Sequence, residues 1–278
     1  MTHSVLVPSS LTREAEDKRE ATRKLGYVAR AATIFRVDRL IVYPDEDGDD
    51  GRFGDGFVET VLEYAATPPY LRKEIWERRN ELEFAGVLPP LRVRTRTGSG
   101  SDGSGSLRQG IVTEVGSDER VRVNCGLQHP ISLPVPPSMV VSEGERVTIR
   151  VSSREPVRAK LVDEPLPGFA TERATIETCL TRPDAGVRIA ASRLGEALTI
   201  DRLGDVAERS ADDGLTLAFG APGRGLPEIL DCEPRAETIG DEPNVRFDLW
   251  LNTVPNQGSE TIRTEEALFA TLAPLTLE

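Results

Sequence analysis

The chain has 278 residues, enough for one large domain or two ordinary ones, each with a hydrophobic core. Apolar residues make up 38% of it, but no apolar run approaches the roughly 18 residues of a membrane-spanning helix, which argues against a membrane protein. The formal net charge of −12 argues against a nucleic-acid partner at ordinary ionic strength.

The basic residues are almost all arginine, since only four of the 34 are lysine, and acidic residues are spread along the whole chain. Abundant carboxylates with little lysine suit concentrated salt, where repulsion between like charges is screened within a few Å. We interpret the composition as the surface of a halophilic protein. In such salt the net charge no longer excludes RNA, because charge attraction contributes little to binding there.

Cysteine and histidine are too few and too scattered for a metal centre or a disulfide framework. The three cysteines, Cys125, Cys179 and Cys232, are odd in number and far apart, and His3 and His129 are the only histidines. We therefore expect no metal site and no zinc chemistry. The N-terminus lacks the basic start and apolar segment of a secretory signal, so we expect a cytoplasmic protein.

The first third of the chain has the pattern of alternating strands and helices. Apolar periodicity predicts a strand, a long helix, a second strand and two amphipathic helices, in the order Val5–Val7, Thr12–Phe35, Val37–Tyr43, Phe57–Ala66 and Leu71–Phe84. The acidic, glycine-rich run Asp45–Gly56 is expected to be an exposed loop.

After a flexible Gly/Ser run, Thr97–Ser106, the sequence pattern changes. Short β-type runs then alternate with turns, at Arg108–Val115, Arg120–Asn124, Ile131–Val135, Arg146–Val151 and Val157–Val162. They predict a small all-β barrel of the OB or S1 type. Residues 92–162 hold eleven basic and seven acidic residues, a balance of +4. This basic module on an acidic chain predicts RNA binding; alternatively, its arginines only solvate the barrel surface.

The α/β pattern returns in the last third. It predicts a helix, a strand, a helix and two strands, at Glu172–Leu180, Gly186–Ala191, Asp201–Ala211, Leu215–Phe219 and Phe247–Leu251. A C-terminal helix should follow, with Thr264 as its N-cap. We therefore expect a discontinuous α/β domain at residues 1–91 and 163–278, with the barrel inserted at 92–162.

Three polar or glycine-rich loops follow predicted strands, at Ala191–Glu196, Phe219–Leu226 and Leu251–Glu266. In a parallel sheet all three would open at the carboxyl edge, where ligands bind. None matches a GxGxxG or Walker signature, and the histidines allow no Ser/His/Asp triad. The alternative is that they are ordinary strand-to-helix connections.

Three stretches resemble the SPOUT class of methyltransferases. Its second and third motifs resemble Phe219–Leu226 (FGAPGRGL) and Leu251–Leu268 (LNTVPNQGSETIRTEEAL). Its first motif, a helix with an Ala-Arg-x-Ala core before a strand, is similar to Gly26–Tyr43 (GYVARAATIFRVDRLIVY). A SPOUT domain interrupted by an OB-like insertion is the layout of the archaeal and eukaryotic RNA uridine-N3 methyltransferases. The resemblance covers nearly the whole chain.

The resemblance implies a knotted parallel sheet flanked by helices, a trefoil that residue patterns alone would never predict because knots are so rare. It implies a homodimer in which the first motif of one chain completes the other chain's active site. It also implies methylation of a uridine base at N3 in RNA, with ribosomal RNA as the expected substrate and S-adenosylmethionine as methyl donor. The alternatives are an RNA-binding or ribosome-assembly factor without turnover, and a tRNA 2′-O-methyltransferase.

By the same resemblance, twelve residues of the three loops would bind the cofactor: Ser192, Gly195, Phe219, Gly220, Gly225, Leu226, Leu251, Asn252, Thr253, Pro255, Gln257 and Thr261. The glycines would allow close backbone approach, and the uncharged polar side chains offer hydrogen bonds. The small-residue run Ala221–Arg224 departs from the bulkier loop expected of relatives, which affects the shape of the cofactor floor.

Three residues are the catalytic candidates. Arg30 would contact RNA or the acceptor from across the dimer, Glu260 is a candidate base, and Arg263 would hold phosphate or dock the opposite subunit. The alternative for Arg30 is a purely structural arginine. Glu265 and Glu266 are further base candidates but would equally stabilise the first turn of the C-terminal helix.

Overall fold

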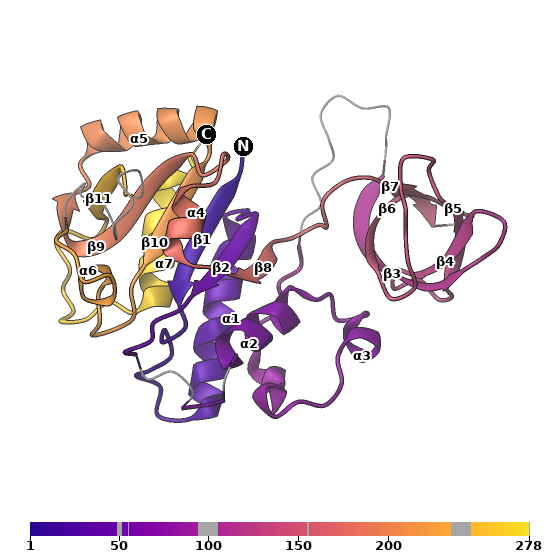
Figure 1. Cartoon of the computed structure of the whole chain (residues 1–278), viewed down its shortest axis with the longest axis horizontal. Coiled ribbons are helices and arrows are strands. Elements are labelled where there is room, and N and C mark those ends of the chain that lie inside the picture. Colours follow the sequence, from indigo (N-terminus) through magenta and orange to yellow (C-terminus); the bar gives the residue numbers. More distant parts are fainter. Residues whose placement is uncertain (49–51, 55, 94–104, 155, 235–245, 278) are drawn as a thin grey trace. The chain divides into compact units, whose positions relative to one another are not determined.

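A computed structural model of the chain describes residues 1–48, 52–54, 56–93, 105–154, 156–234 and 246–277. The chain divides into two compact units (Figure 1). The first unit comprises Met1–Ala66, Arg79–Leu91 and Phe169–Glu278, and the second comprises Thr67–Arg78 and Arg92–Gly168. The second unit thus includes a short segment upstream of the range expected for the barrel.

The first unit is built on a six-stranded sheet in the order β11-β9-β10-β1-β2-β8, with every pairing parallel. Its strands are β1 (His3–Pro8), β2 (Arg39–Tyr43), β8 (Ala170–Arg173), β9 (Val187–Ala197), β10 (Leu215–Phe219) and β11 (Leu249–Asn252). The predicted α/β class with a parallel sheet is therefore confirmed.

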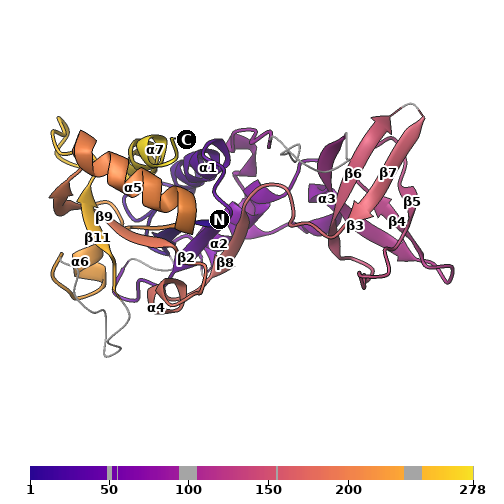
Figure 2. The same cartoon turned by 90° about the horizontal axis from the view of Figure 1, so that it is seen from above.

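Helices cover both faces of this sheet (Figure 2). One face carries α1 (Lys18–Ile34), α2 (Phe57–Ala66), α5 (Ile200–Asp213) and α7 (Thr264–Leu275), and the other carries α4 (Ile176–Leu180) and α6 (Leu226–Ile229). Successive strand residues point to opposite faces. Val5 and Val7 accordingly join the first core, whereas Leu6 joins the second.

The helix predicted over Leu71–Phe84 is wrong. The chain forms only α3 (Arg72–Ile75) and two 3₁₀ turns, η1 (Asn80–Leu82) and η2 (Ala85–Val87). Trp76 is extended at φ −114° and ψ 122°, and its indole N–H donates to the Thr67 hydroxyl at 3.0 Å. The break falls where the chain passes from one unit to the other, so tertiary contacts override the helical pattern.

Two further segments form strands where a helix and a loop were predicted, because neighbouring strands pair with them. The first part of the helix predicted over Glu172–Leu180 is strand β8, which pairs with β2 at the edge of the sheet. Residues Ser192–Glu196 of the predicted loop Ala191–Glu196 belong to β9, which continues and pairs with β11 after a shift in register. A Cβ on Gly195 would lie 2.6 Å from the carbonyl carbon of Trp250, so only glycine lets these strands approach so closely.

The second unit is a five-stranded antiparallel sheet in the order β5-β4-β3-β6-β7, which curls toward a barrel. Its strands match the five predicted β-type runs and are β3 (Ser106–Val115), β4 (Arg120–Asn124), β5 (Ile131–Pro134), β6 (Arg146–Arg154) and β7 (Val157–Val162). Tyr70, from the upstream segment, packs its ring against Gly126 and donates its hydroxyl to the carbonyl of Gln109 at 2.9 Å. The upstream segment is thereby part of this unit's structure.

Within the described ranges of the chain, none of the helices has the length and apolar character needed to cross a bilayer.

A paired charge joins β9 to β11 at their amino ends. Arg188 donates from Nε and Nη2 to the carboxylate of Asp248, at 3.0 and 2.7 Å, and its backbone N–H donates at 2.9 Å. Burial alone would raise the pKa of Asp248, but the hydrogen bonds from Arg188 lower it below its ordinary value. The pair therefore stabilises the fold only while Asp248 is ionised.

Replacement of Asp248 by Asn should lower the free energy of unfolding at pH 7 by about 1.5–3 kcal/mol, the usual range for hydrogen bonds to a charged group. Because the folded-state pKa lies below the unfolded one, this stabilisation is present above about pH 4 and is lost as the pH falls through the folded pKa. Denaturant unfolding at pH 7 and at acid pH measures the difference, which should shrink in acid. The exposed Asp212→Asn is the control, and an equal loss in both variants would contradict the assignment.

Candidate functional site

A cavity of about 290 Å³ lies at the carboxyl ends of β9, β10 and β11. Its lining comes from three segments that are distant in sequence: Ala191–Leu194, Phe219–Glu228 and parts of Asn252–Ala267. The volume lies just below the usual range for small-molecule sites, roughly 300–1,000 Å³. The three segments predicted as loops therefore contribute to one hollow at one edge of the sheet, although the first of them is part of β9.

Most of the residues expected at the cofactor line this cavity. They are Ser192, Phe219, Gly220, Gly225, Leu226, Asn252, Thr253, Gln257 and Thr261, together with the catalytic candidate Glu260. Three others do not line it: Gly195 packs on the backbone of β11, Leu251 is fully buried in the core, and Pro255 is exposed. Gly195 and Leu251 support the site from behind.

The loop after β10 closes on itself in a tight turn. Ala221 and Arg224 exchange backbone hydrogen bonds of 2.9 and 3.1 Å, and Gly223 has a φ of +72°, which favours glycine. A Cβ on Gly220 would lie 2.7 Å from the backbone nitrogen of Leu226, so the turn requires glycine there too. Among the described residues, neither the amide N–H of Gly223 nor that of Gly225 donates a hydrogen bond, and both residues line the cavity.

Two side chains hold this loop from opposite sides. The Tyr43 hydroxyl, at the end of β2, donates to the carbonyl of Phe219 at 2.7 Å. The Thr264 hydroxyl, at the start of α7, donates to the carbonyl of Gly220 at 2.8 Å. Burial raises the pKa of Tyr43 well above its ordinary value, so the phenol stays protonated and remains a donor. Thr264 was expected as an N-cap, but Arg263 takes that position and Thr264 serves the loop instead.

Arg224 ties the same loop to the end of β2. Its Nε lies 3.1 and 3.2 Å from the two carboxylate oxygens of Asp45, and Nη1 donates to Glu228 at 2.9 Å. Asp45 is only 2% exposed, so the prediction of an exposed loop from this residue onward is wrong at Asp45. Sequence reasoning missed it because several acidic residues follow one another here, and only its place two residues after a strand distinguishes it.

Several polar side chains of the third cavity segment, Asn252–Ala267, form hydrogen bonds that fix the conformation of the segment itself. Asn252 accepts from the amide of Val254 at 3.0 Å and donates to the carbonyl of Arg193 at 3.2 Å, which joins this segment to the second half of β9. The hydroxyls of Thr253 and Thr271 lie 2.8 Å apart. Gln257 donates to the carbonyl of Ser259 at 2.8 Å. These side chains shape the cavity wall.

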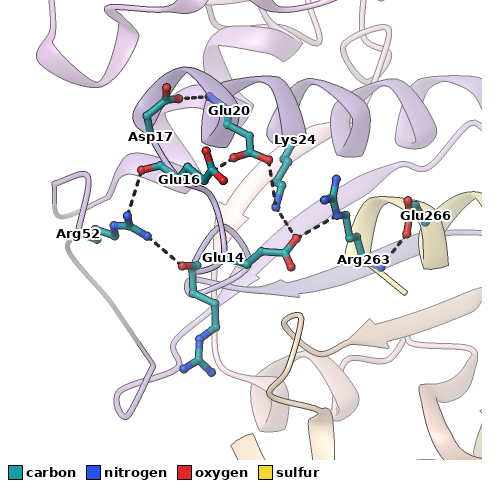
Figure 3. A network of polar contacts seen from close by, with 9 residues as sticks. Glu14, Glu16, Asp17, Glu20, Lys24, Arg52, Arg263 and Glu266 are labelled. Atoms are coloured by element: carbon teal, nitrogen blue, oxygen red, sulfur yellow. Dashed lines mark hydrogen bonds and ion pairs between the residues drawn. The ribbon is translucent and has the colours of Figure 1, made fainter. Parts of the chain in front are cut away.

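Arg30 and Arg263 lie outside the cavity lining. Arg30, on α1, donates from Nη1 to the carbonyls of Leu91 at 2.9 Å and Pro90 at 3.3 Å. Within one chain Arg30 therefore holds the backbone that leads out of the first unit. Arg263 lies 3.5 Å from Glu14, and its backbone N–H donates to Glu266 at 2.9 Å, so Glu266 stabilises the first turn of α7 (Figure 3).

An ionic cluster lies where α1 meets the start of α7 (Figure 3). Lys24, only 3% exposed, bonds to Glu14, which also pairs with Arg263. Glu265 is buried close to this cluster, and one of its carboxylate oxygens has no hydrogen-bond partner among the described residues. Desolvation raises the pKa of Glu265. The cluster thus fixes the end of the segment that lines the cavity.

The described part of the chain contains no group of three or more His, Cys, Asp or Glu side chains that could hold a metal ion. The polar groups around the cavity are amides, hydroxyls and backbone groups, the guanidinium groups of Arg193 and Arg224, and the carboxylates of Glu228 and Glu260. Such a lining can hydrogen-bond a neutral heterocycle, and the carboxylate of Glu260 can accommodate a cationic group.

The sequence profile of the family described as "Putative RNA methyltransferase" matches residues 2–275. The chain belongs to this family. Its enzyme class is therefore that of the RNA methyltransferases, as the resemblance implied.

Similar proteins occur in archaea and in animals. An uncharacterized protein of Haloarcula marismortui is 70% identical over 100% of this chain and 99% of its own length, and one of Halobacterium salinarum is 68% identical over the same shares. The 28S rRNA (uridine-N(3))-methyltransferase of Homo sapiens is 32% identical over 99% of this chain and 77% of its own length. The two archaea are halophiles, which fits the arginine-rich, acidic composition.

Proposed function

We propose that the chain transfers a methyl group from S-adenosylmethionine to N3 of a uridine in ribosomal RNA. The observation that carries the proposal is the convergence of Ala191–Leu194, Phe219–Glu228 and Asn252–Ala267 on one cavity. Two of these segments hold the SPOUT-like motifs, and the carboxyl edge of a parallel sheet is where such folds bind ligands. The name of the human relative supports uridine N3 as the target atom.

The cavity residues fit the methyl donor. The amide N–H groups of Gly223 and Gly225, which donate no hydrogen bond among the described residues, suit the ring nitrogens of adenine, and the carboxylate of Glu260 suits a sulfonium cation. When bound, the donor supplies a methyl group on a positively charged sulfur. The chain's own contribution is to hold the acceptor base in line with that methyl group and to exclude water.

Uridine must lose its N3 proton for the reaction to finish. Glu260 is the carboxylate of the third motif that lines the cavity, and we assign it as the proton acceptor. Arg263 would neutralise a phosphate of the same RNA or dock the second subunit. Its side chain is about half exposed beside Glu14, so it remains accessible for this role.

The homodimer is part of the proposal. Tyr27 and Ile34 are 48% and 47% exposed on the outer face of α1, and Arg30 lies between them at helical spacing. A second copy packed on this face would cover the two apolar side chains and carry Arg30 toward the partner's cavity.

A trefoil knot also belongs to the proposal. In the sheet, β11 lies next to β9 and is separated from β10 by it. The helix that follows β11, α7, nevertheless contacts β10 and α1. The segment between β11 and α7 must therefore cross the ends of β9 and β10.

The inserted barrel, proposed as residues 92–162, would bind RNA. Arg158 and Lys160 are exposed, share one face of β7, and have no ion-pair partner among the described residues. Other arginines of this unit are engaged: Arg120 bonds to Ser132, and Arg122 lies 3.5 Å from Glu114. The free pair is therefore the best candidate for binding phosphate.

Titration calorimetry with S-adenosylmethionine, followed by transfer of a tritiated methyl group to ribosomal RNA, tests the proposal. We expect saturable binding of the donor and incorporation into ribosomal RNA, with 3-methyluridine as the labelled nucleoside. Nucleosides from a deletion strain should lack that product at one position. Binding without transfer to any RNA would favour an assembly factor, and a labelled ribose in tRNA would favour 2′-O-methylation.

Replacement of Arg30 by Ala should reduce methyl transfer by about 10²–10³-fold, the usual cost of losing one group that stabilises charge in the transition state. Affinity for the methyl donor should change by less than about threefold. Turnover assays and calorimetry measure the two quantities, with the exposed Arg23→Ala on the same helix as control. Equal losses of both would mean that Arg30 acts only through its bonds to Pro90 and Leu91.

Mixed dimers test the role of Arg30 across the interface. Gly220→Ala should spoil the cavity of its own chain, because the added Cβ meets the backbone of Leu226. Co-expression of this variant with Arg30→Ala should restore part of the activity, since one site of the mixed dimer has both an intact cavity and an intact Arg30 from its partner. No recovery would contradict a shared site.

Replacing Arg158 and Lys160 together by Gln should weaken RNA binding and reduce the slope of log affinity against log salt by about 2, roughly one for each phosphate-binding side chain removed. Affinity for the methyl donor should not change. Filter binding over a salt series measures the slope. Arg19→Gln with Arg23→Gln, two exposed arginines of α1, removes the same charge from the first unit. An unchanged slope would exclude Arg158 and Lys160 as phosphate-binding residues.

A further inference from the structure

A buried carboxylate, Asp45, lies behind the loop that follows β10. It comes two residues after the end of β2, outside the three motif-like stretches Gly26–Tyr43, Phe219–Leu226 and Leu251–Leu268. Its carboxylate accepts from the Ser10 hydroxyl and from Nε of Arg224, and its backbone N–H donates to the Ser9 hydroxyl at 3.1 Å. A Cβ on Gly48 would come 2.5 Å from Asp45 Oδ2, so a close turn covers the carboxylate. Asp45 is thus held on all sides.

Arg224 is the side chain through which Asp45 reaches the cavity. It lines the cavity, yet its side chain is only 12% exposed. It stands between Gly223 and Gly225, two residues whose backbones are intrinsically free. Its other carboxylate partners, Glu228 at 2.9 Å and Asp47 at 3.7 Å, are exposed, and exposed ion pairs contribute little. Asp45 is therefore the partner that fixes Arg224.

We infer that Asp45 is a positioning residue for the methyl donor: through Arg224 it holds the Phe219–Leu226 loop in the shape that the donor binds. The inference rests on the proposed function. Without the charge of Asp45, Arg224 would stay partly buried with exposed partners only, which favours its release toward water. The two flanking glycines would then sample other conformations, and binding would have to order them again.

The consequence is a selective loss of affinity. Asp45 does not line the cavity, so its removal should weaken binding of the methyl donor without slowing transfer once the donor is saturating. An arginine–carboxylate pair with a purely stabilising role would leave donor affinity unchanged. Arg188 and Asp248 provide that comparison, since they form a two-pronged pair in the same sheet but at its amino ends.

The test compares Asp45→Asn with Asp248→Asn in the full-length protein. Calorimetry with S-adenosylmethionine and with S-adenosylhomocysteine gives the affinities, and thermal unfolding gives stability. We expect both variants to lower Tm, but only Asp45→Asn to weaken both ligands by tenfold or more, which equals about 1.4 kcal/mol. Its KM for the donor should rise while kcat at saturating donor stays within twofold of the unaltered enzyme. Unchanged affinity, or equal weakening in both variants, would overturn the inference.

Arg224→Lys carries the test if Asp45→Asn does not fold. Lysine keeps the charge but lacks the Nε–H and the planar fork of arginine, so donor affinity should fall here too. The double variant should bind no more weakly than the worse single variant, because both changes break one link. Additive losses would overturn the inference. If the unaltered chain binds neither ligand, the proposed function itself fails, whereas failure of the variants alone leaves that function standing.

Discussion

The site depends on two hydrogen bonds to adjacent carbonyls, those of Phe219 and Gly220. Their donors come from opposite directions, the Tyr43 hydroxyl from β2 and the Thr264 hydroxyl from α7. The loop after β10 is thereby held by elements that are far apart in sequence. Both donors are buried, and each bond contributes about 0.5–1.5 kcal/mol, the usual net value of an intramolecular hydrogen bond.

The rest of the cavity follows from that loop. Thr264 can reach Gly220 only because the chain after β11 returns across the sheet edge, and the cluster around Glu14, Lys24 and Arg263 fixes the end of that return. Asn252 joins the same segment to the second half of β9. The three cavity segments therefore form one connected unit, in which a shift of one would be transmitted to the others.

Strand positions could be predicted well from the sequence, because buried strands of a parallel sheet are short apolar runs. The predictions failed where tertiary contacts determine the secondary structure. The polar β8 is a strand only because β2 offers its edge, and the segment from Leu71 to Phe84 is divided between two units. At Ser192–Glu196 the glycine suggested a loop, whereas Gly195 permits the close packing of two strands.

For the site, residue patterns and resemblance identified the correct segments but not the hydrogen bonds that each side chain makes. Nothing in the sequence distinguishes Asn252, which braces its own loop, from a side chain that is free to meet a ligand. Asp45 carries no local signal either, because its importance arises from Arg224, a residue 179 positions away.

The central position of β1 has a consequence for synthesis. Val5 pairs with Leu40 on one side and with Leu217 on the other. The nascent chain can thus form one of these ladders early, but the opposite edge of β1 stays open until the last quarter of the protein leaves the ribosome. The five strands of the second unit are near neighbours in sequence and need no such delay. Co-translational folding should therefore begin with the small unit, and the exposed edge of β1 is the place where a chaperone would be needed.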